Sequence, residues 1–371
     1  MPQTNAGKGR GLRSLATGEN TRPSPAIPIV SLFSGAGGLD LGFTDAGFEP
    51  VLAIDIDPAA CQTFKLNHST SHVIRYDLSN VPKGYIPARL SELPKDVRPI
   101  GVIGGPPCQA FSLSNVYKKT DDPRARLPAS YARILAELNK AFRIDFFVFE
   151  NVLGLKHRQH EELFRYFKRL FRAAGFKIVE GQLDAKDFGV PQERKRVFII
   201  GFNEDRYPNL KFAFPLGELK AWRTVRDAIH GLPEPVFFDR SLTPNKIPYH
   251  PNHWCMRPRS GKFSNGFLKE GDMKGRPFRV LEWNRPSWTV AYGHREVHVH
   301  PSGRRRLSVY EAMLLQGFPP EYQLVGTLSD QIRLVSDAVP PALGSALGKE
   351  IRSTLETSSR QMRKILRGKR N

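Results

Sequence analysis

The sequence predicts an α/β fold: a Rossmann-like, doubly wound, mostly parallel sheet with a smaller inserted domain. Between residues 27 and 205, short continuous apolar runs alternate with segments of helical spacing. This alternation is typical of parallel strands that helices cover on both faces. Between residues 206 and 300 this alternation is absent, and the sequence instead contains many prolines, many cations and scattered aromatic residues. That change predicts a loop-rich, basic insertion.

Five apolar runs are predicted to be strands, at Ile29–Phe33, Val51–Ile54, Gly101–Ile103, Phe146–Phe149 and Val197–Ile200. Helical spacing appears between them at Tyr131–Phe142 and Glu161–Ala174, and again at Ser308–Gln316 and after Pro341. In such sheets, ligands bind beyond the carboxyl ends of the strands. The polar residues that follow these runs should therefore meet in one crevice.

The composition favours a polyanionic partner. Lys and Arg outnumber Asp and Glu by 56 to 36, which gives a net charge of +20, and nucleic acid is the commonest partner of such a surface. The three cysteines show neither a disulfide framework nor a zinc spacing, which fits the cytoplasm. No apolar run reaches the roughly 20 residues needed to span a bilayer. Residues 1–26 and 352–371 are interpreted as basic tails.

A glycine-rich turn and an acid suggest a nucleotide-like ligand. Gly35 and Gly37 follow the first predicted strand, where glycine lets the backbone approach a ligand closely. Asp55 ends the second, where a carboxylate binds ribose hydroxyls in nucleotide folds. No Lys-Ser/Thr pair follows the glycines, so a P-loop is excluded. A plain tight turn remains an equal alternative on these residues alone.

Cys108 stands out among the cysteines. Pro106 and Pro107 stiffen the loop before it, and a cysteine nucleophile needs such a fixed, polar site. Cys61 and Cys255 are interpreted as small packed side chains, the usual role of a lone cysteine.

Three charged residues should share the crevice with Cys108. Glu150 follows the fourth predicted strand, and Arg194 and Arg196 precede the fifth. Each alone is more often a surface residue. Together they suggest a site that stabilises a thiolate and a charged intermediate.

Six segments, in order, resemble the motifs of the cytosine-5 DNA methyltransferases of bacterial restriction–modification systems: Ser31–Gly38, Gly105–Gln109, Phe149–Val152, Gln192–Arg196, Arg306–Pro319 and Ala338–Pro341. The resemblance extends from about Ile27 to Ile351. It implies an S-adenosylmethionine-dependent catalytic domain at 27–205, a target-recognition domain at 206–300, and a returning part of the catalytic domain at 301–351.

The resemblance also implies residue roles in holding the methyl donor. Phe33 and Ile56 would contact the adenine of S-adenosylmethionine, Asp55 would bind the ribose, and Asp77 would reach the adenine amino group. Gly35 and Gly37 would lie against the methionine part.

On the substrate side, the resemblance implies that Cys108 attacks carbon 6 of a flipped cytosine and Glu150 protonates N3. Arg194 would contact the base carbonyl or a phosphate, and Arg196 belongs to the same motif. Basic residues of the insertion would contact DNA, the candidates being Arg240, Arg257, Arg259 and Arg276. The family often has Asp where this chain has Ser31, and Asn where it has Asp337.

Three functions therefore compete: a double-stranded DNA methyltransferase, acting as a monomer and paired with a restriction endonuclease; an RNA cytosine-5 methyltransferase; and a catalytically silent DNA-binding protein. RNA-acting relatives carry Cys-Phe-Thr in the recognition region, whereas here the cysteine stands in Trp254-Cys255-Met256. The intact Cys108 and Glu150 argue against a silent protein. The target sequence is not readable from residues 206–300.

Overall fold

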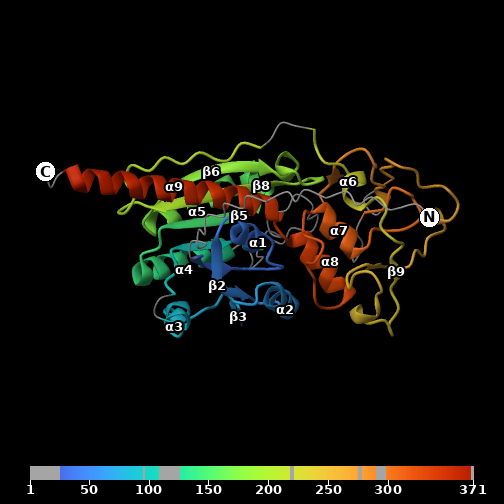
Figure 1. Ribbon diagram of the computed structural model, residues 1–371, viewed down its shortest axis with the longest axis horizontal. Coiled ribbons are helices and arrows are strands. Elements are labelled where there is room, and N and C mark those ends of the chain that lie inside the picture. Colours follow the sequence, from blue (N-terminus) through green and yellow to red (C-terminus); the bar gives the residue numbers. More distant parts are fainter. Residues whose placement is uncertain are drawn as a thin grey trace, which may run out of the picture.

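A seven-stranded, mostly parallel sheet forms the larger part of the molecule (Figure 1). The computed structural model describes residues 26–94, 97–107, 126–217, 221–274, 278–289 and 298–368. The strand order is β3-β2-β1-β4-β5-β8-β6, and only β8 runs antiparallel to its neighbours. The strands are β1 (Ile27–Leu32), β2 (Phe48–Asp55), β3 (His72–Arg75), β4 (Gly101–Gly104), β5 (Phe146–Val152), β6 (Phe176–Asp184) and β8 (Lys195–Asn203). The predicted fold class is confirmed.

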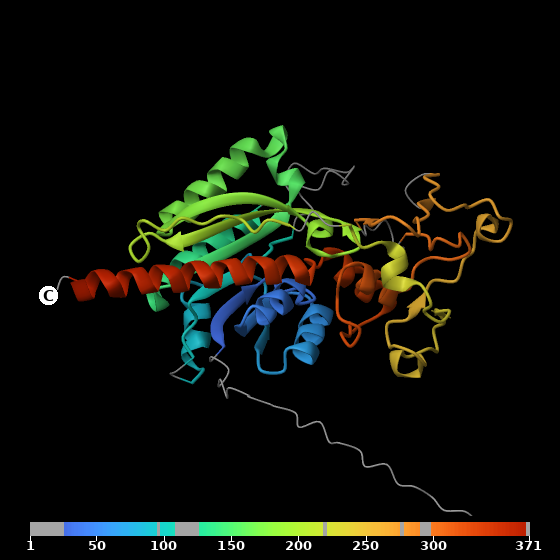
Figure 2. The same ribbon diagram turned by 45° about the horizontal axis from the view of Figure 1, so that its top comes forward.

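Helices cover both faces of this sheet because its strands are apolar on both sides. In β5, Phe146 and Val148 pack toward one face, and Phe147 and Phe149 toward the other. The first face is covered by α1 (Gly38–Asp45) and α9 (Pro341–Gly368), the second by α4 (Leu127–Phe142) and α5 (Glu161–Ala173). Figure 2 shows α9 and α5 on opposite sides of the sheet. Two shorter helices, α2 (Pro58–Asn67) and α3 (Tyr85–Ser91), complete this α/β unit.

The end of the chain is anchored on its beginning by a close helix contact. A Cβ added at Gly42 of α1 would overlap the carbonyl oxygen of Pro341, and one at Gly344 would lie 2.6 Å from that of Leu39. Glycine is therefore required where α1 and α9 cross. The helix also corrects a prediction, because α9 continues through the expected tail to Gly368 and buries Leu355.

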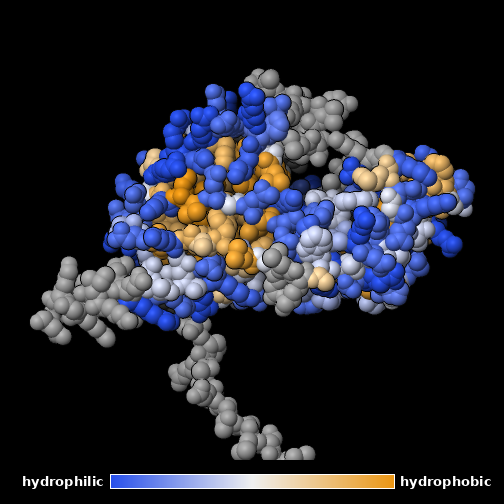
Figure 3. Space-filling view, turned by 90° about the horizontal axis from the view of Figure 1, so that it is seen from above, coloured by the Kyte–Doolittle hydropathy of each residue, from blue (hydrophilic) through white to orange (hydrophobic). Residues whose placement is uncertain are grey.

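The rest of the chain forms a smaller unit, residues 221–338, built from short elements. These are α6 (Val225–Ile229), β9 (Val236–Phe237), β10 (Trp254–Cys255), β11 (Ser287–Trp288), α7 (Val309–Leu315) and α8 (Leu328–Asp337). β9 pairs with β10, while β11 pairs with β7 (Gln192–Glu193) of the α/β unit. Figure 3 shows mostly hydrophilic side chains on this unit and an apolar area on the α/β unit.

The core of the smaller unit crosses the boundary that the sequence suggests at residue 301. Val225 and Trp254 of the insertion belong to the same apolar cluster as Met313 of α7 and Val335 of α8. The amphipathic helices α7 and α8 bury their apolar faces in this cluster, against the insertion and also against Ala59 and Ala60 of α2. No helix in the described ranges is long and apolar enough to cross a membrane.

Candidate active site

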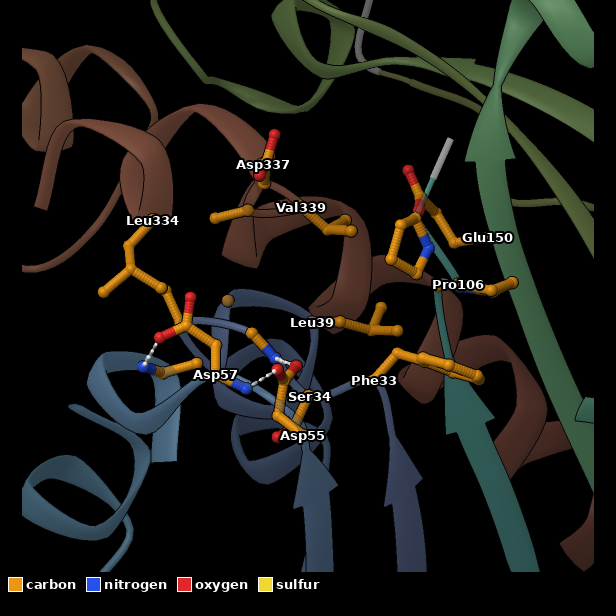
Figure 4. A pocket seen from close by; sticks show the side chains of 18 of the residues that line it. Phe33, Ser34, Leu39, Asp55, Asp57, Pro106, Glu150, Leu334, Asp337 and Val339 are labelled. Atoms are coloured by element: carbon orange, nitrogen blue, oxygen red, sulfur yellow. Dashed lines mark hydrogen bonds between the residues drawn. The ribbon is translucent and has the colours of Figure 1, made fainter. Parts of the chain in front are cut away.

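A cavity of about 270 Å³ opens at the carboxyl ends of β1, β2, β4 and β5 (Figure 4). Chain order reverses between β1 and β4, and this is the position where doubly wound sheets bind ligands. The opposite wall comes from the end of α8 and from Ala338 and Val339, which follow it. The lining includes Phe33, Asp55, Pro106, Glu150, Leu334 and Val339.

Asp55 is held rigidly at one end of the cavity. Its Oδ2 accepts a hydrogen bond of 2.8 Å from the Gly35 backbone N–H, and its Oδ1 one of 2.9 Å from that of Asp57. Burial raises the pKa of Asp55, and these two hydrogen bonds oppose the shift. Ile56 lines the cavity beside it and is 57% exposed, so an apolar ring can cover it.

The turn after β1 is shaped by left-handed backbone. Gly35 and Gly37 have φ angles of 54° and 76°, and Phe33 has a φ of 55°, unusual for a residue with a side chain. A Cβ on Gly37 would lie 2.8 Å from both His68 Nε2 and Tyr322 Oη. Gly35 and Phe33 line the cavity, whereas Gly37 lies behind it and fixes the turn.

Glu150 and Arg196 form an ion pair at the other end of the cavity. The Arg196 Nε lies 3.0 Å from Glu150 Oε1, and both side chains are about nine-tenths buried. Burial raises the pKa of Glu150, and Arg196 and Arg194 oppose the shift. A Cβ on Gly105 would lie 2.5 Å from Glu150 Oε2. Glycine at 105 therefore keeps this carboxyl group accessible.

Arg194, by contrast, lies outside the cavity lining. It is 0% exposed, and its guanidinium donates to the backbone oxygens of Ser336 and Ala338. Its own backbone N–H donates to Asp184 Oδ1 at 3.0 Å. Arg194 thus ties the wall formed by the end of α8 to the sheet, and Arg196 is the arginine of its motif that reaches the cavity.

Asp77 also lies outside the cavity lining. It is exposed after β3, and its Oδ1 accepts a hydrogen bond of 2.9 Å from the Ser79 backbone N–H. The structure thus brings Phe33, Gly35, Asp55, Ile56, Glu150 and Arg196 together around one cavity.

Two charged residues among the lining residues that sequence reasoning missed are Asp57 and Arg333. Asp57 caps α2, accepting from Ala59 N–H at 2.8 Å, and an Asp before Pro58 is a readable cap signal. Arg333 of α8 pairs with Asp57 and with Asp330. No local sequence signal identifies Arg333, because its role depends on α8 packing against α2.

At position 31, where the family often has Asp, this chain has Ser31, and a carboxyl group from the next helix lies in the same lining. Asp40 of α1 lines the cavity together with Ser31. Burial raises the pKa of Asp40 to about 7, and the neighbouring Ser31 hydroxyl acts in the opposite direction. A carboxyl group is therefore still present at this site, although it comes from a different position in the chain.

Cys108 lies outside the described residues, but the loop leading to it is well defined. Pro106 and Pro107 line the cavity, and the Asn151 Nδ2 donates to the Pro106 carbonyl oxygen at 3.3 Å. Of the other cysteines, Cys255 is buried, as interpreted from the sequence, whereas Cys61 is half-buried and its thiol donates to the Asp55 backbone oxygen. Burial raises the pKa of Cys61 to about 11 and that of Cys255 to about 12, so both are poor nucleophiles.

Residues 27–353 match the family of C-5 cytosine-specific DNA methylases. The chain belongs to this family. It is a DNA cytosine-5 methyltransferase, and its methyl donor is S-adenosylmethionine.

Relatives of similar length agree with this assignment. The methyltransferase is 36% identical to the type II methyltransferase M.MthTI of Methanothermobacter thermautotrophicus, over 89% of this chain and 98% of the relative. It is 32% identical to M.NgoPII of Neisseria gonorrhoeae, over 91% and 99%. A solved structure from E. coli, described as a DNA modification methyltransferase encoded within a prophage, shares the fold with a TM-score of 0.74. It is 24% identical, over 89% of this chain and all of that one.

The cavity fits S-adenosylmethionine by its chemistry. Phe33, Leu334 and Val339 offer apolar surface, and Asp55 offers a fixed carboxylate that can accept from hydroxyl groups. No phosphate site is needed, and the glycine-rich turn provides none. When bound, the donor supplies an electrophilic methyl group on a sulfonium centre.

Proposed function

We propose that this methyltransferase modifies a flipped cytosine in a specific double-stranded DNA sequence and protects that sequence from a partner restriction endonuclease. We further propose that it acts as a monomer in the cytoplasm. One observation supports the chemistry above all: a single cavity extends from Asp55 to the Glu150–Arg196 pair and is lined by the prolines that precede Cys108.

The donor would occupy the end of the cavity near β2. Asp55 would accept from the ribose hydroxyls, because both of its oxygens are already fixed by backbone N–H groups. Phe33 and Ile56 would cover the adenine, and Gly35 would lie beside the methionine part. Asp77 is proposed on the resemblance alone and is the residue of this set that lies outside the cavity lining.

The cytosine would enter at the end near β5. The Cys108 thiolate adds to carbon 6, and Glu150 protonates N3 as negative charge develops there. The raised pKa of Glu150 favours the protonated form that this role needs. Carbon 5 gains electron density and accepts the methyl group. Loss of the proton on carbon 5 then expels the thiolate, and return of the N3 proton to Glu150 restores the neutral ring.

Arg196 would keep Glu150 oriented and offset the charge that the thiolate brings. Arg194 would act from behind the cavity, holding Ser336 and Ala338 in place. The base contact implied by the resemblance is thus better suited to Arg196, which lines the cavity, than to Arg194.

The smaller unit would bind the duplex and recover the cost of extruding the base, about a few kcal/mol. Arg240, Arg257 and Arg259 are exposed on it and are candidates for phosphate or guanine contacts. Arg276, a fourth candidate, lies outside the described residues.

Incubation with labelled S-adenosylmethionine and either unmethylated plasmid DNA or transfer RNA tests the reaction. Label should enter DNA and reside in 5-methylcytosine. Label in RNA alone would contradict the proposal.

Bisulfite sequencing of the modified plasmid tests sequence specificity, and digestion with restriction enzymes tests protection. One short sequence should be methylated and resist the endonuclease that cuts there. Methylation scattered without a common sequence would contradict a restriction–modification role.

A further inference from the structure

The cavity is acidic although the protein as a whole is strongly basic. Its lining contains five carboxyl groups and two arginines: Asp40, Asp55, Asp57, Glu150 and Asp337, with Arg196 and Arg333. Both arginines are already engaged, Arg196 with Glu150 and Arg333 with Asp57 and Asp330. Of the remaining carboxyl groups, Asp40 is only partly ionised near neutral pH because burial raises its pKa to about 7. Asp55 and Asp337 therefore carry most of the negative charge that suits a cation.

Asp337 lies between the two ends of the cavity. Its carboxyl group interacts electrostatically with Asp55 at the donor end and with Glu150 at the base end. Figure 4 shows it on the opposite side of the cavity from Asp55. Any group that is transferred from the donor to the base must pass through this middle region.

The position of Asp337 has no structural explanation in the helix that carries it. It is the last residue of α8, where a negative charge opposes the helix dipole. Across the described part of the chain, no hydrogen bond or ion pair joins its side chain to another residue. The Asp337 side chain is exposed where it lines the cavity. Desolvation by the surrounding protein raises its pKa, and the neighbouring Arg194, Arg333 and Arg196 oppose that shift. A carboxylate placed at a local cost beside a cavity points to a cationic ligand.

The methyl donor and the product that remains after methyl transfer differ in charge at the sulfur atom. S-adenosylmethionine carries a sulfonium, an ammonium and a carboxylate, for a net charge of +1, whereas S-adenosylhomocysteine carries a neutral thioether and no net charge. A carboxylate that lines the cavity distinguishes such ligands by Coulomb attraction.

We propose that Asp337 makes the cavity select the cationic methyl donor over its neutral product. The inference rests on the proposed placement of the donor in this cavity. An amide at this position would retain shape and hydrogen bonding but lose the charge. Asp337 thus favours release of the product and its replacement by fresh donor in each turnover.

Titration calorimetry of the full-length protein with S-adenosylmethionine and with S-adenosylhomocysteine tests this selection. The Asp337→Asn variant should lower the ratio of donor affinity to product affinity about tenfold, mainly by weakening the donor. Asp337→Glu, which keeps the charge, should restore most of the ratio. Asp205→Asn, the same change at an exposed position after β8, should leave the ratio unchanged.

Asp55→Ala separates this inference from the assignment of the cavity. This variant should weaken both ligands, because both contain the ribose. If it weakens neither, the donor binds elsewhere and the proposed site fails. If it weakens both while Asp337→Asn and Asp337→Glu keep the wild-type ratio within twofold, the role of Asp337 is overturned.

Discussion

The α/β unit and the smaller unit are stabilised in different ways. The sheet is held by continuous backbone ladders and an aromatic core, whereas the smaller unit combines an apolar cluster with buried side-chain networks. In the latter, Arg305 contacts both oxygens of Glu311 at 2.9 Å and Glu234 at 2.7 Å. His253 bonds Ser308, and Trp254 bonds Gln331. A ladder fixes where strand-end residues lie, whereas in the smaller unit the positions of the loops depend on individual side-chain contacts.

The largest effect is expected in the α/β unit from Cys108→Ser. Methyl transfer should fall by more than about a thousandfold, because a hydroxyl is a far weaker nucleophile than a thiolate. Donor and DNA binding should persist, since the change removes only the nucleophile. Rate assays with calorimetry check this, and retained methylation would exclude Cys108 from its role.

Glu150→Gln should have the next largest effect on methyl transfer. The amide cannot supply the proton at N3 and no longer neutralises Arg196, so kcat should fall about a hundredfold or more. Donor affinity should change little because Glu150 lies at the base end. Single-turnover kinetics give the measurement. An unchanged rate would show that another group provides the proton.

In the smaller unit, Arg305→Met should act on stability rather than chemistry. It leaves Glu311 buried without its bidentate partner, a defect that costs about 3 kcal/mol or more. Thermal unfolding should show this loss, whereas donor affinity measured well below the transition should survive, because α8, which lines the donor cavity, is then still folded. An unfolding temperature equal to that of the wild type would show that the Arg305 network contributes little to the stability of the smaller unit.

Acid should weaken the smaller unit through its histidines. Burial lowers the pKa of His250, His298 and His300 from 6.5 to about 4. Because the unfolded chain binds these protons first, their contribution is complete above pH 6.5 and is lost as the pH falls toward 4. Unfolding temperatures measured from pH 7.5 to 4.5 should show a decline that is shallower in His298→Gln. An identical slope would exclude His298.

The smallest effect concerns a surface cation. Arg257 is exposed, with its guanidinium 5.3 Å from the centre of the Phe237 ring. If it contacts a phosphate, Arg257→Ala should weaken binding to all duplexes by a few-fold and reduce the salt dependence by about one ion. Equilibrium binding over a salt series measures both. A loss confined to the target sequence would instead identify a base contact.

The sequence is informative where function follows backbone geometry. The apolar runs ending at Phe33, Asp55 and Glu150 place these residues at strand ends, and the structure gathers them around one cavity. The sequence does not distinguish the roles of the two neighbouring arginines of this motif. Arg194 precedes β8, whereas Arg196 lies within it, and only the packed structure shows that the first is buried and the second lines the cavity.

The smaller unit was less predictable for a physical reason. Its elements are too short to show a period, and α7 and α8 are separated in sequence from the segments they pack against. The boundary expected at residue 301 follows the change in sequence pattern, and an apolar cluster continues across it. Arg333 and Asp337 illustrate the same difficulty, because their roles arise from contacts between distant parts of the chain.

The crossing of α1 and α9 has a consequence for biosynthesis. The cavity needs Phe33 and Asp55 from early in translation and Leu334 and Val339 from near its end. The glycines at the helix crossing can make contact only after α9 has left the ribosome. A nascent or truncated chain therefore lacks one wall of the donor site, and methylation of the genome begins only with chains whose synthesis has reached the final helix.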